Sequence, residues 1–308
     1  MADSTRNGDG DAAGARPAES ALHAPHALRI TDVHIHVQPF DQLKPAVKAV
    51  MHGGRSDRLE LLMAIMREPA TLLQIMDEDG IDRVGLINYP SPNIMGFTPD
   101  TNDFAARYAE ADRRRLLPYG GVDPLTATDP AGEVRHLVEI GARVAKIHPC
   151  HMGFAANAYT QGLTALADVY RACEDAGLPV MVHTGTSIFP GARSKFGNPM
   201  ELDDVAIDFP DLTLIMAHGG RPLYASEAFF VLRRHKRVWL DLSGIPPRTL
   251  PDYFPRLAEL SDRVLWGTDW PSPGVASMRG NVEQFLGLRY PDALKRAALE
   301  TNPLRLLP

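Results

Sequence analysis

Cysteine is scarce in this sequence, and several features of other protein classes are missing. Only two cysteines, Cys150 and Cys173, occur among 308 residues, which excludes a disulfide framework. No apolar stretch is long enough to cross a bilayer. With a net charge of -6 and scattered basic residues, the chain lacks the electrostatic surface that nucleic acid or an acidic membrane requires. We therefore expect a cytoplasmic protein that acts on a small molecule, without nucleic-acid or membrane partners.

The N-terminal segment, residues 1–28, differs in composition from the rest of the chain. It is rich in Ala, Gly, Asp, Ser and Pro and shows no apolar period, which predicts a disordered tail. A secretory signal needs a basic start followed by a continuous apolar run, and MADSTRNGDGDAAGARPAES has neither, so we expect no export. A hydrophobic content of 44% is enough for a large core in the remaining residues, 29–308.

Short apolar runs rich in Val, Ile and Leu alternate with amphipathic stretches from Arg29 onward, a pattern typical of strands buried on both faces. The runs are LRITDVHIHV, DRVGLINYP, LLPYGGVDP, RVAKIHP, PVMVHTG, LTLIMAHGG, RVWLDLSG and RVLWGTDWP. Eight such units, about 30 residues apart after a longer first gap, predict an α/β fold with a single (β/α)₈ TIM barrel. An open doubly wound sheet stays possible, but no glycine-rich phosphate loop follows any strand.

The segments between the strands contain a clear helix and three insertions. Leu163–Ala176 has an apolar face at helical spacing and stops before a glycine. The first gap contains SDRLELLMAIMRE, in which Ser56 could cap a helix, and it predicts a short lid insertion over the barrel mouth after strand 1. Residues 91–101 and 187–199 are rich in Gly, Pro and Asn and are predicted to be loops that line a pocket.

Polar side chains lie at the carboxyl ends of several predicted strands. His34 and His36 share one face of the first strand and can chelate one metal ion, although two structural histidines fit this pair alone equally well. The other residues at this position are Lys146, His148, His183, His218 and Asp269. Barrel enzymes place their catalytic groups at this edge, and imidazole with carboxylate suits zinc or a similar ion. Chance burial does not explain so many polar groups at one rim.

At these residues the chain resembles the amidohydrolase superfamily, specifically its amidohydrolase-related branch, which is typified by aminocarboxymuconate-semialdehyde decarboxylase and also includes lactonases. The matching pieces are DVHIHV, AKIHP, VMVHTG, LIMAHGG, VLWGTDWP and TNPLRLL, in the family's order and spacing. The resemblance implies a divalent metal, Zn²⁺ by default or Mn²⁺, held by His34, His36, His183 and Asp269. It also implies that His218 is catalytic and that the protein is a homodimer.

Three functions are compatible with these residues. The leading hypothesis is a metal-dependent hydrolase in which metal-activated water attacks an amide, lactone or related carbonyl while Asp269 or His218 moves the proton. The alternative is a metal-dependent non-oxidative decarboxylase of an aromatic or muconate-type acid, with the same ligands. An inactive scaffold barrel that binds metal is the third. Several arginines converging on the metal would favour an acid substrate, whereas an apolar pocket with an open water position would favour hydrolysis.

Further residues near the rim are predicted to bind the substrate. Lys146 and His148 share a face of the fourth strand. Some members of the wider superfamily carry a carbamylated lysine there that bridges two metals, but the branch resembled usually has one metal and no carbamate, so this lysine is expected to neutralise an anion. Arg221 and Arg193 could bind a substrate carboxylate, with solvated surface charge as the alternative. Trp270 could form the floor of the pocket.

Overall fold

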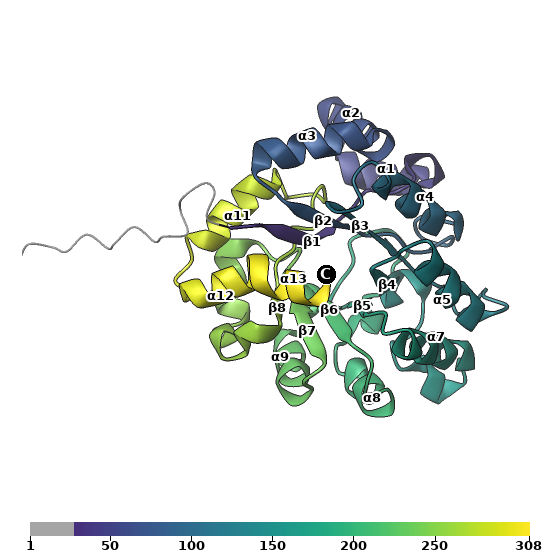
Figure 1. Ribbon diagram of the computed structural model, residues 1–308. Helices are drawn as coiled ribbons and strands as arrows, with labels where there is room; N and C mark the ends of the chain where they lie inside the picture. The colour runs from purple at the N-terminus through teal and green to yellow at the C-terminus, as the bar shows by residue number, and fades with distance from the viewer. Residues whose placement is uncertain (1–27) are drawn as a thin grey trace, which may run out of the picture.

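The computed structural model describes residues 28–308, and almost all of the tail predicted for residues 1–28 lies outside the described residues. Eight parallel strands form one sheet in chain order (Figure 1). They are β1 (Thr31–Ile35), β2 (Arg83–Leu86), β3 (Leu116–Gly120), β4 (Val144–Ile147), β5 (Val180–His183), β6 (Leu214–Ala217), β7 (Val238–Asp241) and β8 (Val264–Leu265). Hydrogen bonds from Val33 N to Trp266 O (3.0 Å) and from His36 N to Trp270 O (2.8 Å) close the sheet into a ring. The predicted TIM barrel is confirmed.

Helices surround the barrel on its outside (Figure 1). The main ones are α3 (Pro69–Asp79), α4 (Asp100–Ala109), α5 (Pro130–Glu139), α7 (Thr164–Asp175), α8 (Glu201–Asp208), α9 (Ala225–Arg234), α11 (Met278–Leu286), α12 (Asp292–Arg296) and α13 (Asn302–Leu306). Shorter turns of helix, α6 (Pro149–Met152) and α10 (Leu250–Tyr253), follow β4 and β7. The helix predicted for Leu163–Ala176 is α7, which buries Leu166, Val169 and Tyr170 against the barrel wall. No helix in the described part of the chain is long and apolar enough to cross a membrane.

The insertion after β1 consists of helices α1 (Pro45–His52) and α2 (Ser56–Arg67), followed by α3. Ser56 is the first residue of α2 and makes no capping hydrogen bond, so the predicted Ser56 cap is wrong; Arg55 occupies the cap position. Only α1 of these helices reaches the cavity at the barrel mouth, through Met51. Arg58 of α2 instead donates to the carbonyl of Ser272 at 2.9 Å, which fixes the insertion to the loop after β8.

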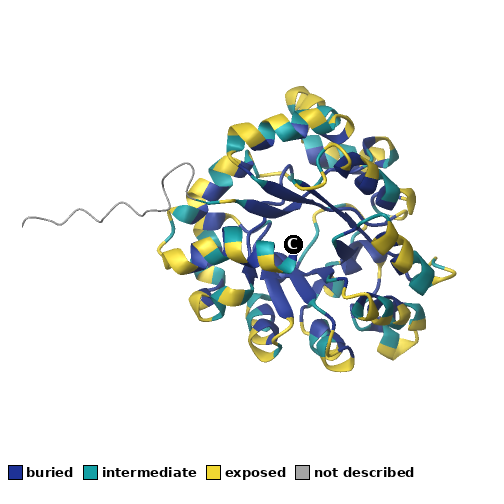
Figure 2. Ribbon diagram, viewed as in Figure 1, coloured by how far each residue is buried: buried dark blue, intermediate teal, exposed yellow. Residues whose placement is uncertain are grey.

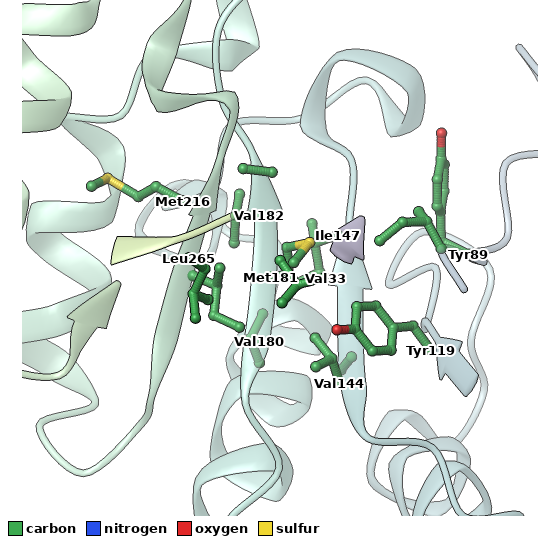
Figure 3. Packing of buried hydrophobic residues seen from close by; sticks show 14 of the residues in the cluster. Val33, Tyr89, Tyr119, Val144, Ile147, Val180, Met181, Val182, Met216 and Leu265 are labelled. Carbon is green, nitrogen blue, oxygen red and sulfur yellow. The ribbon is translucent and has the colours of Figure 1, made fainter. Parts of the chain in front are cut away.

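The barrel interior is filled by strand side chains. Val33, Tyr119, Val144, Val180 and Leu265 are buried completely and lie among the strands (Figure 3). Every residue of the eight strands is buried, while the outer faces of the helices carry the exposed residues (Figure 2). Apolar side chains are thus packed on the strands, and the polar residues of the candidate site lie toward the carboxyl ends of the strands.

Candidate metal centre and active site

One cavity of about 540 Å³ opens at the carboxyl ends of the strands. The predicted site residues in its wall are His34, His36, Lys146, His148, His183, His218, Arg221 and Asp269. The two predicted loops also line it, with Met95 from the first and Ser187 and Phe189 from the second. The rim position predicted from the strand ends therefore corresponds to a single cavity.

Two residues predicted to bind substrate do not line this cavity. Trp270 is 3% exposed, pairs with Ile35 of β1 and is not among the residues that line the cavity, whereas its neighbour Asp269 is. Arg193 lies on the exposed surface of the loop after β5, where only its backbone N–H bonds inward, to the carbonyl of Cys150 at 3.0 Å. The sequence could not show these orientations because both depend on how the loops fold.

Three of the four predicted metal ligands form one group. The Nε2 atom of His36 lies 2.9 Å from Oδ1 of Asp269, and Nε2 of His34 lies 3.4 Å from the same oxygen. One ligand atom from each residue lies within 4.8 Å of the others. Burial would raise the pKa of Asp269, but the hydrogen bond and charge of His36, together with His34 and Arg221, lower it. Asp269 is therefore ionised at neutral pH and faces two imidazoles.

The protonation of His34 shows that this group fits a cation. Its Nδ1 lies 2.6 Å from Oδ2 of Asp241, so Nδ1 carries the proton and donates it to the carboxylate. The opposite atom, Nε2, is then an unprotonated lone pair, and it is buried without a hydrogen-bond partner. A lone pair and a carboxylate oxygen repel each other at 3.4 Å unless positive charge lies between them. Two imidazoles and a carboxylate are a donor set that zinc and similar divalent ions take.

A buried network behind His34 fixes its orientation. Asp241 accepts hydrogen bonds from Ser243 Oγ (2.7 Å) and Ser243 N (2.9 Å) as well as from His34. Burial raises the pKa of Asp241 to about 6, against the opposing effect of these bonds and of Lys146. Gly267 leaves room for the network, since a Cβ there would lie 2.7 Å from both Asp241 Oδ1 and His34 Cβ. Asp241 was not predicted from the sequence, although it occupies the strand-end position on β7 that the other site residues occupy on their strands.

His183, the fourth predicted ligand, faces the same cavity but belongs to a neighbouring group. Its possible ligand atoms group with those of His148 and Cys150. The rings of His183 and His148 are stacked, with centroids 3.7 Å apart, and His148 stacks in turn on His151 at 3.5 Å. Both His183 Nε2 and His148 Nδ1 are buried without a hydrogen-bond partner. Because stacked rings direct their lone pairs along parallel planes, these histidines suit a shared ion less well than the group around Asp269.

His218 is held with a free nitrogen toward the cavity. Its Nδ1 lies 2.9 Å from the carbonyl oxygen of Ser243, which can only accept, so the proton is on Nδ1 and Nε2 is bare. Burial and the charge of Arg221 keep the pKa of His218 well below its ordinary value, so the ring is neutral. The ring centroid lies 4.7 Å from those of both His34 and His183. A neutral imidazole with a bare nitrogen beside a metal group can act as a general base.

Two residues of the site have unusual backbone conformations. His218 has φ of 68° and Asp269 has φ of 67°, in the left-handed region that residues with a side chain rarely adopt. Each costs about 1–3 kcal/mol and persists only where the surroundings impose it. They are the only two non-glycine residues with positive φ in the described chain, and both lie at the rim.

Three cationic side chains give the cavity a positive lining. Lys146 Nζ is buried without a hydrogen-bond partner, and burial lowers its pKa to about 8 despite the nearby carboxylates of Asp241 and Asp269. Arg221 lies 3.7 Å from Asp269 Oδ2 and occupies space left by a glycine. Arg248, which sequence analysis missed, is exposed at the cavity mouth. The three cations outnumber the two nearby carboxylates, Asp241 and Asp269, and this favours an anionic substrate.

Comparisons with known proteins show which family the chain belongs to. The sequence model of a family described as Amidohydrolase matches residues 31–308. A curated relative, 2-pyrone-4,6-dicarboxylate hydrolase of Comamonas testosteroni, is 30% identical over 154 residues, which cover 38% of this chain and 50% of that protein. The match thus spans about half the length of that relative.

Solved structures of similar fold include enzymes of two kinds. A probable 2-pyrone-4,6-dicarboxylic acid hydrolase of Acinetobacter baumannii, solved with citric acid bound, is 16% identical with a TM-score of 0.64, covering 91% of this chain and 99% of that one. A 5-carboxyvanillate decarboxylase of Novosphingobium aromaticivorans, complexed with manganese and a nitrobenzoic acid, is 15% identical with a TM-score of 0.65, covering 92% and 97%. At these identities the likeness shows the shared barrel and no more.

Proposed function

The chain belongs to the amidohydrolase family, and from that premise we propose that it is a metal-dependent hydrolase that opens a cyclic ester carrying carboxylate groups. The observation that carries the proposal is that the cation group of His34, His36 and Asp269, the bare Nε2 of His218 and three side-chain cations share one cavity. The first two features suit hydrolysis and the third suits an acid substrate. A carboxylated lactone combines both requirements, as does the substrate named for the Comamonas relative.

His34, His36 and Asp269 would hold the metal, with His183 as the predicted fourth ligand. Zinc is the default for such ligands, and manganese is the alternative because the similar decarboxylase structure contains it. When bound, the ion supplies positive charge that polarises a carbonyl and makes water a stronger acid. Asp241 keeps the proton of His34 on Nδ1, so that Nε2 stays available.

The other residues of the cavity then act on substrate and water. Arg221 and Arg248 bind carboxylate groups of the substrate, and Lys146 balances the negative charge that builds up on the reacting carbonyl. His218 accepts a proton from the attacking water at Nε2 and returns it to the ring oxygen when the carbon–oxygen bond of the ester breaks. One water is consumed, one new carboxylic acid is formed and no carbon dioxide is released.

The alternative, non-oxidative decarboxylation of an aromatic or muconate-type acid, is favoured by the same positive lining. Arg221, Arg248 and Lys146 would hold a carboxylated phenol as well as a carboxylated lactone. The two reactions differ in their products, because only decarboxylation releases carbon dioxide. The stoichiometry of the products therefore separates them without any assumption about the substrate pose.

The test is to assay the metal-loaded protein with 2-pyrone-4,6-dicarboxylate and with 5-carboxyvanillate, following acid release and carbon dioxide together. We expect ring opening of the lactone with one acid equivalent and no carbon dioxide. His218→Gln should lower kcat by about 10²–10⁴-fold, the usual contribution of a general base. The matched control is His136→Gln, because His136 is exposed in α5 and outside the cavity. Carbon dioxide from the phenol would establish the alternative, and turnover of neither compound by metal-loaded protein would favour the inactive scaffold.

A further inference from the structure

A second cavity, of about 280 Å³, lies at the opposite end of the barrel from the candidate active site. Its wall contains Arg29, Arg83, Arg113, Arg114 and Arg143, together with Leu117, Leu304 and Pro308. The arginines come from the amino ends of four consecutive strands, β1 to β4. Figure 1 views the molecule from this end, with the C-terminus near its centre. Five guanidinium groups around one small cavity repel each other unless negative charge is present.

The most buried of these arginines is incompletely paired. Arg83, at the start of β2, is 5% exposed, and its Nη2 donates to the carbonyl of Leu307. Its Nε is buried without any hydrogen-bond partner. Burial and the neighbouring charges of Arg143 and Arg29 lower the pKa of Arg83. A buried guanidinium next to other cations is costly, and an anion in the cavity would lower that cost through its opposite charge.

The acidic groups nearby do not supply enough charge. Asp82 accepts hydrogen bonds from Arg29 at 3.1 and 3.3 Å, and Glu110 pairs with Arg113 at 3.5 Å. Among the described residues, no side-chain hydrogen bond or ion pair joins Arg114 or Arg143 to a carboxylate. Two cations and the Nε of Arg83 therefore remain unpaired around the cavity.

Arginines at the same strand position elsewhere in the barrel show a different arrangement. Arg237, just before β7, forms an ion pair with Asp211 at 3.1 Å. Arg263, just before β8, donates to the carbonyls of Leu232, His235 and Val238. An arginine before a strand is thus common in this chain, and on the β7–β8 side each one has protein partners. On the β1–β4 side, Arg115 before β3 also has a partner, Asp77 at 2.7 Å, but Arg114 and Arg143 line the cavity without a carboxylate partner among the described residues.

From this contrast we propose that the arginine cavity is a binding site for a phosphate group, separate from the active site. A phosphate dianion places two charges in a small volume and offers three or four oxygens in a tetrahedral arrangement. Guanidinium groups that approach from four different strands match such an ion better than a planar carboxylate, which presents only two oxygens. Arg114 and Arg143 are the donors that the anion would pair, and the charge of the anion would offset that of the buried Arg83.

The test is calorimetric titration of the full-length protein with inorganic phosphate at 0.15 M ionic strength, with a nucleoside monophosphate in a parallel arm. We expect saturable binding with one site per chain. Tighter binding of the nucleotide would identify a phosphate ester as the natural source, and equal binding would identify the free ion. Phosphate should also raise Tm, because a ligand that binds only the folded chain stabilises it.

Variants separate this site from surface charge and from the active-site cations. Arg143→Ala and Arg114→Ala should each weaken phosphate binding by about tenfold, as expected for the loss of a charge-assisted hydrogen bond. Arg237→Ala, the matched control, should leave the affinity unchanged, and so should Arg248→Ala at the active-site mouth. No saturable binding, or binding that is weakened by Arg248→Ala but not by the cavity variants, would overturn the proposal. Turnover of the lactone plays no part in this test, so the two proposals fail independently.

Discussion

Replacing Asp241 with Asn tests whether the buried network behind His34 prepares it to bind metal. The carboxylate makes three hydrogen bonds of 2.6, 2.7 and 2.9 Å, one of them to His34 Nδ1, and Asp241 is completely buried. An Asn of the same shape can still accept from Nδ1, but it lacks the negative charge that makes Nε2 of His34 a stronger ligand. A residue that holds a metal ligand in place through a hydrogen bond contributes about 10- to 100-fold in metal affinity, or about 1.4–2.7 kcal/mol.

The same substitution should leave the metal-free protein stable. Burial raises the pKa of Asp241 to about 6, which means that its ionised form is disfavoured inside the barrel. A neutral amide avoids this cost, but its NH2 group would face the N–H of Ser243, which in the wild type donates to Oδ1. The two effects oppose each other, so Asp241→Asn should unfold within about 2 kcal/mol of the wild type when metal is absent. The assay is a metal titration against a competing chelator, together with urea unfolding of the apoprotein; Asp211→Asn, on the surface, is the control. Unchanged metal affinity in Asp241→Asn would refute the reasoning.

Three further substitutions test other parts of the structure. Gly267→Ala places a Cβ 2.7 Å from Asp241 Oδ1 and His34 Cβ, so its free energy of unfolding in urea should fall by about 1–3 kcal/mol. The control Gly287→Ala, whose Cβ would have no neighbour nearer than 3.5 Å, should leave the free energy of unfolding unchanged. Burial raises the pKa of Glu201 from 4.5 to about 7, so the folded protein loses stability as pH rises through this window. Glu201→Gln should therefore match the wild type in stability at pH 4 and exceed it by about 1–2 kcal/mol at pH 8, after allowance for solvent screening. Equal stability at pH 8 would contradict the burial argument. Lys146→Met removes a buried ammonium without a hydrogen-bond partner and should stabilise the apoprotein in urea. Because this ammonium balances charge that builds up on the reacting carbonyl, the change should also lower kcat, and an unchanged kcat would exclude that role.

The fold could be predicted from the sequence because its signals are local. Each strand is a short Val, Ile and Leu run that is buried on both faces, and eight of them at regular spacing leave few architectures. The residues at the rim could be predicted in the same way, because the carboxyl ends of parallel strands meet at one edge of the barrel. His34, His36, His218 and Asp269 all lie in the wall of the one cavity there.

What sequence analysis missed depends on contacts between distant segments. The bond between His34 and Asp241 joins residues 207 positions apart, and Gly267 gains its role only because both of them pack against it. The prediction that Trp270 forms the floor of the pocket came from its place beside Asp269, without knowledge that its backbone pairs with β1. The sequence shows that arginines recur at the amino ends of the strands, but it does not show which of them lack a partner.

The most direct test of the metal centre is the metal content of purified protein, measured by mass spectrometry for the wild type and for His36→Ala, His183→Ala and His136→Ala. We predict one equivalent of zinc or manganese per chain in the wild type and in the exposed-surface control His136→Ala. His36→Ala should lose the metal, because His36 Nε2 lies 2.9 Å from Asp269 Oδ1 in the proposed ligand group, and loss in His183→Ala would identify the fourth ligand. Full metal content in His36→Ala, or full turnover by wild-type protein stripped of metal, would contradict the assignment.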